Sequence, residues 1–180
     1  MTLKDFRKLV NSDIERFAEH IETTLTWKRR ISIFFMPSIQ ALFLYRLNRF
    51  LYLRGHRLIP RILFTLNIVI YGTDIPPTTR IGGYFYMPHT VGMTLFGVIG
   101  ERCTCYAQAA VGGGSGNETL DIGAGPGLPV IGDNTLIGAR AMVVGPIRIG
   151  AGSFIGANTF ITEDLPENST VVAKPNKPIA

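Results

Sequence analysis

The chain has 180 residues, enough for one domain with an appendage and a buried core. Its content of 46% hydrophobic and 17% charged residues excludes an intrinsically disordered protein. The net charge of +5 is unevenly distributed, because Lys28 to Arg61 hold eight basic residues and no acid, whereas Ile75 onward has six basic and seven acidic residues. The basic excess therefore belongs to the N-terminal part.

Residues 1–73 are predicted to form a short helical arm. Ser12 to Glu15 have the spacing of a capping box, which predicts a first helix that runs to about Thr23. A second helix is expected from about Ser38 to Arg54, where Gly55 would end it. The apolar segment Ile59 to Tyr71 stops at Gly72. This segment and the earlier apolar segment Ile31 to Tyr45 are both shorter than the roughly 20 residues needed to span a bilayer.

The N-terminus lacks the apolar core and cleavage site of a secretory signal, so we expect a cytoplasmic protein. Arginines mixed with aromatic residues from Phe43 to Arg54 suit a helix that lies on the inner face of an anionic membrane. A helix packed on the rest of the chain or on a neighbouring subunit explains the same pattern. The sequence leaves both interpretations open.

Residues 74–163 are organised by aliphatic anchors at a spacing of six. The anchors are Ile75, Ile81, Met87, Met93, Ile99, Cys105 and Val111, then Ile131, Ile137, Val143, Ile149, Ile155 and Ile161. The extra residues 117–130 separate the two runs and are predicted to be an inserted loop. A period of six is typical of a parallel β-helix, in which each repeat makes one strand and one corner. Residues 164–180 follow as a tail.

The positions two residues before the anchors support this fold, because period-2 alternation places them on the same side of the strand. They are mostly small, as a narrow filled interior requires. Cys103 and Cys105 both fall on inward positions and should pack as small hydrophobic side chains. With no other Cys or His near them in sequence, we expect no metal site.

His89 is the single histidine of the repeat region, in the setting Pro88-His89-Thr90. With Met87 as an anchor, it falls at a corner and points toward solvent or a partner subunit. A corner histidine is often inert, so spacing alone does not assign it a role. Gly112 to Gly116 could approach a ligand with bare backbone N–H groups, although glycine runs are common in loops.

Several motifs together resemble the serine acetyltransferases, which belong to the hexapeptide-repeat acyltransferases. They are the repeat array, Pro88 to Gly92, Val111-Gly112-Gly113, Ile137-Gly138-Ala139, Ile155-Gly156-Ala157 and Val172 to Pro175. The resemblance implies a mainly β protein, with a left-handed parallel β-helix of hexapeptide repeats assembled as a homotrimer. It also implies acetyl-CoA as cosubstrate, with each active site between adjacent coils.

By this resemblance His89 is the general base that removes the proton of the acceptor hydroxyl, and Asp74 orients it. An imidazole with a near-neutral pKa suits this task. The resemblance further implies that Gly113 donates to the thioester oxygen, that Ala139 and Ala157 line the pantetheine groove, and that Lys174 lies near the phosphates of coenzyme A. The spacing itself does not bring Asp74 to His89, since a full coil would be eighteen residues and they are fifteen apart.

The chain departs from the serine-specific pattern at three positions. Pro88 stands where serine-specific members have an aspartate, and Gly127-Leu128 stand where they have Arg-His. The lost residues would hold the ammonium and carboxylate of serine. We therefore expect a sugar hydroxyl of a polysaccharide or lipid-linked precursor as the acceptor, with serine O-acetylation in cysteine synthesis as the alternative. A catalytically silent scaffold is a third interpretation, and no nucleic-acid partner is expected.

Overall fold

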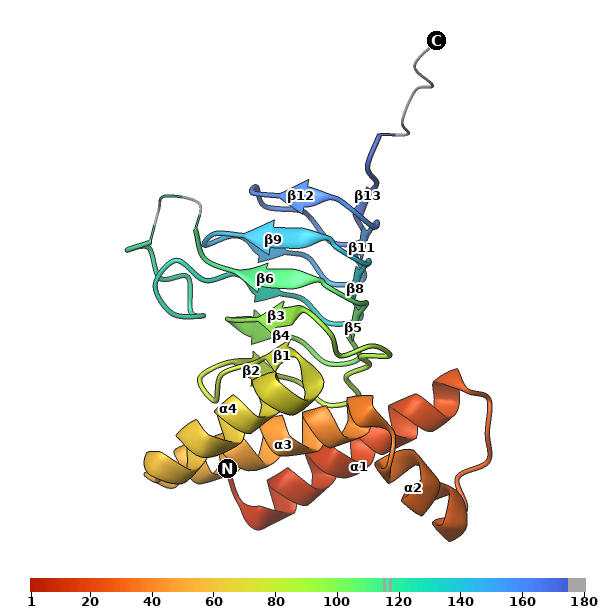
Figure 1. Ribbon diagram of the computed structural model, residues 1–180. Coiled ribbons are helices and arrows are strands. Elements are labelled where there is room, and N and C mark those ends of the chain that lie inside the picture. Colours follow the sequence, from red (N-terminus) through yellow and green to blue (C-terminus); the bar gives the residue numbers. More distant parts are fainter. Residues whose placement is uncertain (115, 117, 175–180) are drawn as a thin grey trace.

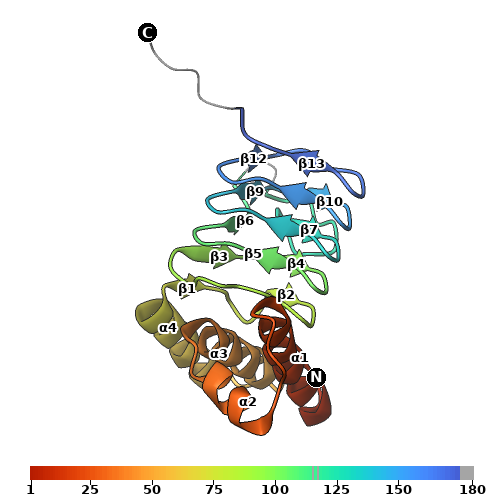
Figure 2. The same ribbon diagram turned by 90° about the vertical axis from the view of Figure 1, so that its right-hand side faces the viewer.

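A layer of helices forms one end of the molecule, and a β-helix stands on it (Figure 1). The structure is a computed structural model that describes residues 1–114, 116 and 118–174. Its helices are α1 (Leu3–His20), α2 (Trp27–Phe34), α3 (Pro37–Tyr52) and α4 (Leu58–Tyr71). Figure 2 shows α1 to α4 beneath the first coil, and β12 (Phe160–Ile161) and β13 (Thr170–Val171) at the opposite end.

The first helix starts earlier than predicted. Its capping box is formed by Thr2 and Asp5: the Thr2 hydroxyl accepts from Asp5 N at 3.1 Å, and the Asp5 carboxylate accepts from Thr2 N at 2.7 Å. The predicted box at Ser12 to Glu15 is wrong, because Ser12 and Asp13 are buried within α1. The helix α2 was not predicted, whereas α4 ends at Gly72 as expected, with Gly72 in the left-handed conformation that favours glycine.

A buried ion pair ties the helical layer to the first coil. The Arg46 guanidinium of α3 donates to both Asp13 carboxylate oxygens of α1, at 3.0 and 3.1 Å. It also donates to the carbonyl of Gly82, and Asp13 accepts from Phe85 N at 3.1 Å. The prediction that placed Arg46 among the membrane-facing or solvent-facing basic residues is wrong, because it is 1% exposed.

The β-helix is left-handed and has three parallel sheets, which we call A, B and C. Sheet A contains β1 (Thr73–Asp74), β3 (Met93–Leu95), β6 (Ala110–Gly112), β9 (Met142–Val144) and β12 (Phe160–Ile161). Sheet B contains β2 (Arg80–Ile81), β4 (Val98–Ile99), β7 (Val130–Ile131) and β10 (Arg148–Ile149). Sheet C contains β5 (Thr104–Cys105), β8 (Leu136–Ile137), β11 (Phe154–Ile155) and β13 (Thr170–Val171).

The predicted anchors form the interior. All thirteen are buried, with exposed fractions from 0 to 7%. Cys103 and Cys105 are buried among them, as predicted, and burial raises the pKa of the Cys103 thiol to about 11. Of the expected inward positions two residues before the anchors, Val91 is the exception at 67% exposed. The period of six therefore identifies the core, apart from one irregular coil.

That irregular coil is the one that carries His89. Tyr86 bridges Thr104, eighteen residues later, but Thr94 pairs with Ala110, only sixteen residues later. The turn that follows Met87 is therefore two residues longer than its neighbour. The expected alignment of Met93 with Val111 is wrong at this point, because Leu95 pairs with Val111.

A tight turn at Gly97 compensates for the two extra residues and returns the chain to the regular eighteen-residue register. Gly97 has φ +103°, and a Cβ added to it would lie 2.4 Å from the carbonyl oxygen of Pro129. This left-handed, close-packed position favours glycine strongly. The next strand, β4, has the regular register again, since Arg80 pairs with Val98, eighteen residues later.

Residues 118–129, which precede β7, form a loop outside the regular coil, and part of this loop contacts sheet B. Arg148 donates to the carbonyl of Ile122 at 2.6 Å, and Arg80 donates to that of Gly123.

No helix in the described ranges is long and apolar enough to cross a membrane.

Candidate active site

The longer turn presents His89 to solvent at the edge where sheet C passes into sheet A, which we call the C–A edge. A hollow of about 260 Å³ adjoins the imidazole. Its walls come from the turn and from the helical arm: Phe17, Met36, Pro37, Ser38, Pro88, Thr90 and Val91. The contribution of α1 and α3 was missed, because no local pattern in the sequence connects the arm to residue 89.

Asp74 lies beside the turn of His89. The turn packs on the residues that precede Asp74, since Gly92 N donates to Gly72 O at 2.9 Å and Thr73 Oγ1 donates to Thr90 O at 3.4 Å. Asp74 itself pairs with Thr94, twenty residues later. The hydrogen bonds of Gly72 and Thr73 thus place the start of β1 against the turn that carries His89, a contact that the regular repeat did not predict.

The Asp74 carboxylate has an unused acceptor. Its Oδ1 is buried and has no hydrogen-bond partner among the described residues, and burial raises the pKa of the carboxyl. No hydrogen bond joins Asp74 to His89 in this part of the chain. Since an unpaired buried acceptor costs about 1–3 kcal/mol, a donor arriving at this position would be favourable.

The predicted cofactor residues Ala139, Ala157 and Lys174 follow His89 along the same C–A edge. Ala139 and Ala157 occupy successive turns, with Asn158 N donating to Ala139 O at 3.0 Å. Val172 packs over Gly156, where an added Cβ would lie 3.1 Å from its Cγ1, and Lys174 follows as an exposed residue. Pro175 and the residues after it lie outside the described part.

Gly113 lies on the opposite side of sheet A. It follows β6, whereas His89 precedes β3, so the width of a three-residue strand, about 10 Å, separates the two positions within one chain. The structure therefore does not bring Gly113 to His89 in a single chain. A hollow of about 370 Å³ lies here, lined by Thr94, Phe96, Ala110, Val111, Gly112, Gly113, Met142 and Val144.

Gly127 and Leu128, the two loop residues that replace the Arg-His of serine-specific members, lie next to Gly113. A Cβ added to Gly113 would be 3.4 Å from the Gly127 carbonyl oxygen and 3.8 Å from a Leu128 methyl group. Pro88 adjoins His89 in the other hollow. The three departures from the serine-specific pattern thus lie at both edges of sheet A, with Pro88 beside His89 and the two loop residues beside Gly113.

Similarity to known proteins decides the family. The model "Bacterial transferase hexapeptide (six repeats)" matches residues 129–163. A serine acetyltransferase of Bacillus licheniformis is 32% identical over 163 residues, covering 88% of this chain and 67% of the relative. The chain belongs to the serine acetyltransferase-like hexapeptide-repeat acyltransferases. This membership confirms the resemblance and the fold expected from it.

Solved structures of the family superpose over nearly the whole chain. A serine acetyltransferase of Neisseria gonorrhoeae has a TM-score of 0.81 at 29% identity, covering 99% of this chain and 68% of the other. The isoform 3 enzyme of Entamoeba histolytica, in complex with cysteine, has a TM-score of 0.80 at 31% identity, covering 98% and 61%.

The expected sugar acceptor is contradicted by these similarities. Several matched relatives are serine acetyltransferases, including one of Mycobacterium tuberculosis that is 33% identical over 149 residues, 82% of this chain. The chain spans only part of such relatives, 62% of this one and 46% of serine acetyltransferase 4 of Arabidopsis thaliana. The loss of charge at Pro88, Gly127 and Leu128 was an insufficient basis for changing the acceptor, because other groups can hold a zwitterion.

Proposed function

We propose that this chain is a serine O-acetyltransferase that transfers the acetyl group of acetyl-CoA to the serine hydroxyl. The observation that carries the proposal is the longer turn of His89, which presents the imidazole at a hollow and is hydrogen-bonded to Gly72 and Thr73, the residues just before Asp74. The C–A edge continues from this turn through Ala139 and Ala157 to Lys174, a course suited to an elongated cosubstrate. The family relationship supports both the donor and the acceptor.

In the proposed reaction, His89 accepts the proton of the serine hydroxyl while the oxygen attacks the acetyl carbonyl carbon. The new C–O bond forms, the thioester C–S bond breaks, and the protonated imidazole returns the proton to the sulfur of coenzyme A. The acceptor oxygen of Asp74 would receive the other imidazole N–H, fixing the ring and stabilising its cationic form. Such a base contributes about 10²–10⁴-fold in rate.

The carbonyl oxygen becomes negatively charged during the attack and needs a hydrogen-bond donor. Gly113 is too far from His89 in its own chain to serve there. We therefore propose that a neighbouring chain contributes Gly113, in a homotrimer whose sites lie between sheet A of one subunit and the C–A edge of the next. Cyclic closure of identical chains accounts for such an arrangement.

Thiol release from acetyl-CoA in the presence of L-serine tests the function. The unmodified chain should show release that depends on L-serine and saturates with it, whereas His89→Ala should lose at least a hundredfold in kcat. His56→Ala is a matched control, because His56 is exposed in the α3–α4 connection, away from the site. Release that does not depend on serine, or His89→Ala turnover above half of the unmodified value, would refute the assignment.

A further inference from the structure

The helix α4 exposes an unusual amount of apolar surface. Of its residues, only Pro60 and Asn67 are buried. Six large aliphatic side chains form what we call the α4 apolar face. They are Leu58, Ile59, Ile62, Leu66, Val69 and Ile70, with exposed fractions from 40 to 74%.

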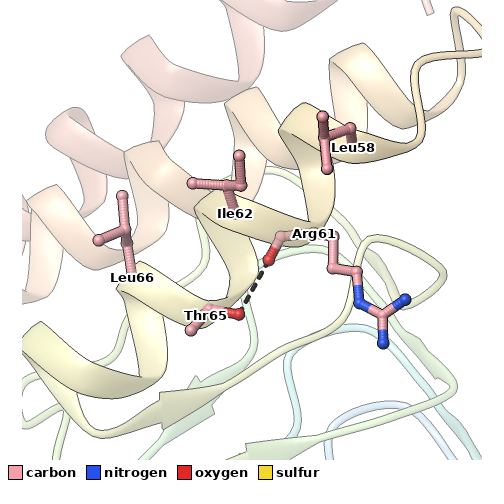
Figure 3. Close-up of a pocket in the computed structure, with 5 residues that line it drawn as sticks. All are labelled: Leu58, Arg61, Ile62, Thr65 and Leu66. Carbon is pink, nitrogen blue, oxygen red and sulfur yellow. Dashed lines mark hydrogen bonds between the residues drawn. The ribbon is translucent and has the colours of Figure 1, made fainter.

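These six side chains share one side of the helix. At about 100° per residue they fall within an arc of about 120°, and Asn67 and Pro60 lie on the side packed against the protein. Figure 3 shows Leu58, Ile62 and Leu66 pointing to the same side, while Arg61 projects from another. A shallow apolar hollow of about 240 Å³ runs along these residues. The α4 apolar face holds no charged side chain.

Basic residues border the N-terminal end of the face. The Arg54 and Arg57 guanidinium groups lie over the rings of Phe50 and Tyr52, and Arg61 is exposed on α4. Within the described ranges, none of the three has a carboxylate within 4.0 Å. The sequence has no acidic residue between Glu22 and Asp74. The three arginines therefore give this end of the face a positive charge that no neighbouring carboxylate neutralises among the described residues.

We propose that the α4 apolar face binds an anionic membrane surface, with the helix parallel to the membrane plane. The aliphatic arc would enter the boundary between headgroups and acyl chains, and the three arginines would meet lipid phosphates. The length of α4, fourteen residues, suits this position and excludes a span. A second copy docked arm to arm would instead place basic residues against basic residues. The proposal goes beyond acetyl transfer and does not depend on the acceptor.

Co-sedimentation of the full chain with lipid vesicles tests the proposal. Vesicles of phosphatidylcholine with phosphatidylglycerol should bind the protein at least tenfold more tightly than phosphatidylcholine alone. The double variant Ile62→Gln and Leu66→Gln should lose at least tenfold in binding to the anionic vesicles. Replacing Arg54, Arg57 and Arg61 by Gln should remove the preference for anionic lipid.

The matched control is Phe154→Gln, since Phe154 is 41% exposed on β11 of sheet C, outside the helical arm. Its vesicle binding should equal that of the unmodified chain. Circular dichroism verifies that the variants keep their helices, and Val69→Gln repeats the test if the double variant unfolds. Equal binding to both vesicle types, or none, would overturn the proposal. So would a double variant that binds vesicles normally but has a lower mass by light scattering, because the face would then be a contact between copies.

Discussion

Replacing Arg46 by Met should strongly destabilise the fold. The substitution keeps much of the side-chain volume but removes the donors to Asp13, at 3.0 and 3.1 Å, and to the Gly82 carbonyl. Asp13 is 2% exposed and would remain as a buried carboxylate with only Phe85 N as a partner. Breaking a buried pair in this way costs about 3–5 kcal/mol. For a chain of this size the midpoint of thermal unfolding should fall by roughly 6–20 °C.

Urea unfolding followed by circular dichroism measures the change in the free energy of unfolding. The double variant Asp13→Leu with Arg46→Met should recover part of the loss, since it leaves no buried charge unpaired. Arg16→Met is a control, because the Arg16–Glu19 pair is on the surface and should contribute less than about 1 kcal/mol. A loss below about 1 kcal/mol for Arg46→Met would refute the argument that this pair fastens the arm to the coil.

Three further predictions concern the site and the thiols. Burial raises the pKa of Asp74, and an acid with a higher pKa in the folded state weakens the fold above that pKa, with the penalty relieved as pH falls through it. Asp74→Asn should therefore leave the free energy of unfolding at pH 7 equal or higher, and a less stable variant in urea unfolding would contradict this. The same variant should lower kcat less than His89→Ala does, because Asp74 orients the base without touching the acceptor. Pro88→Asp should lower KM for L-serine roughly tenfold to a hundredfold, from the 1.5–3 kcal/mol of one charge-assisted hydrogen bond, whereas Pro88→Ala should not; equal KM values for the two variants would count against it. Because the thiols of Cys103 and Cys105 are buried with raised pKa values, a thiol reagent at pH 8 should label neither in the native chain and both in denaturant, and rapid native labelling would disagree with the packed interior.

The β-helix could be predicted from the sequence because its signal is local and repeated. Within each of the two runs, an anchor such as Ile131 or Ile155 is followed six residues later by the next one, and all of them fill the same interior. The Gly72 stop of α4 was likewise predictable, since it depends on the backbone freedom of one residue.

The remaining features depend on contacts between distant residues. The pairing of Asp13 with Arg46 joins two helices, and the pattern around Ser12 instead favoured a helix start. The two-residue shift at Leu95 keeps the overall period, so the aliphatic spacing conceals it. The contact of Gly72 and Thr73 with the turn of His89 likewise joins residues that are distant in sequence. The acceptor could not be predicted from Pro88 or Leu128, because lost partners do not identify those that replace them.

In the proposed reaction, the acetyl group moves from acetyl-CoA to the hydroxyl of serine. Nuclear magnetic resonance of a mixture of the chain, acetyl-CoA carrying a ¹³C-labelled acetyl group, and L-serine tests this directly. The label should appear in O-acetylserine, in an amount equal to the thiol released, and His89→Ala should form no such product. Label found only in free acetate, with serine unchanged, would contradict it.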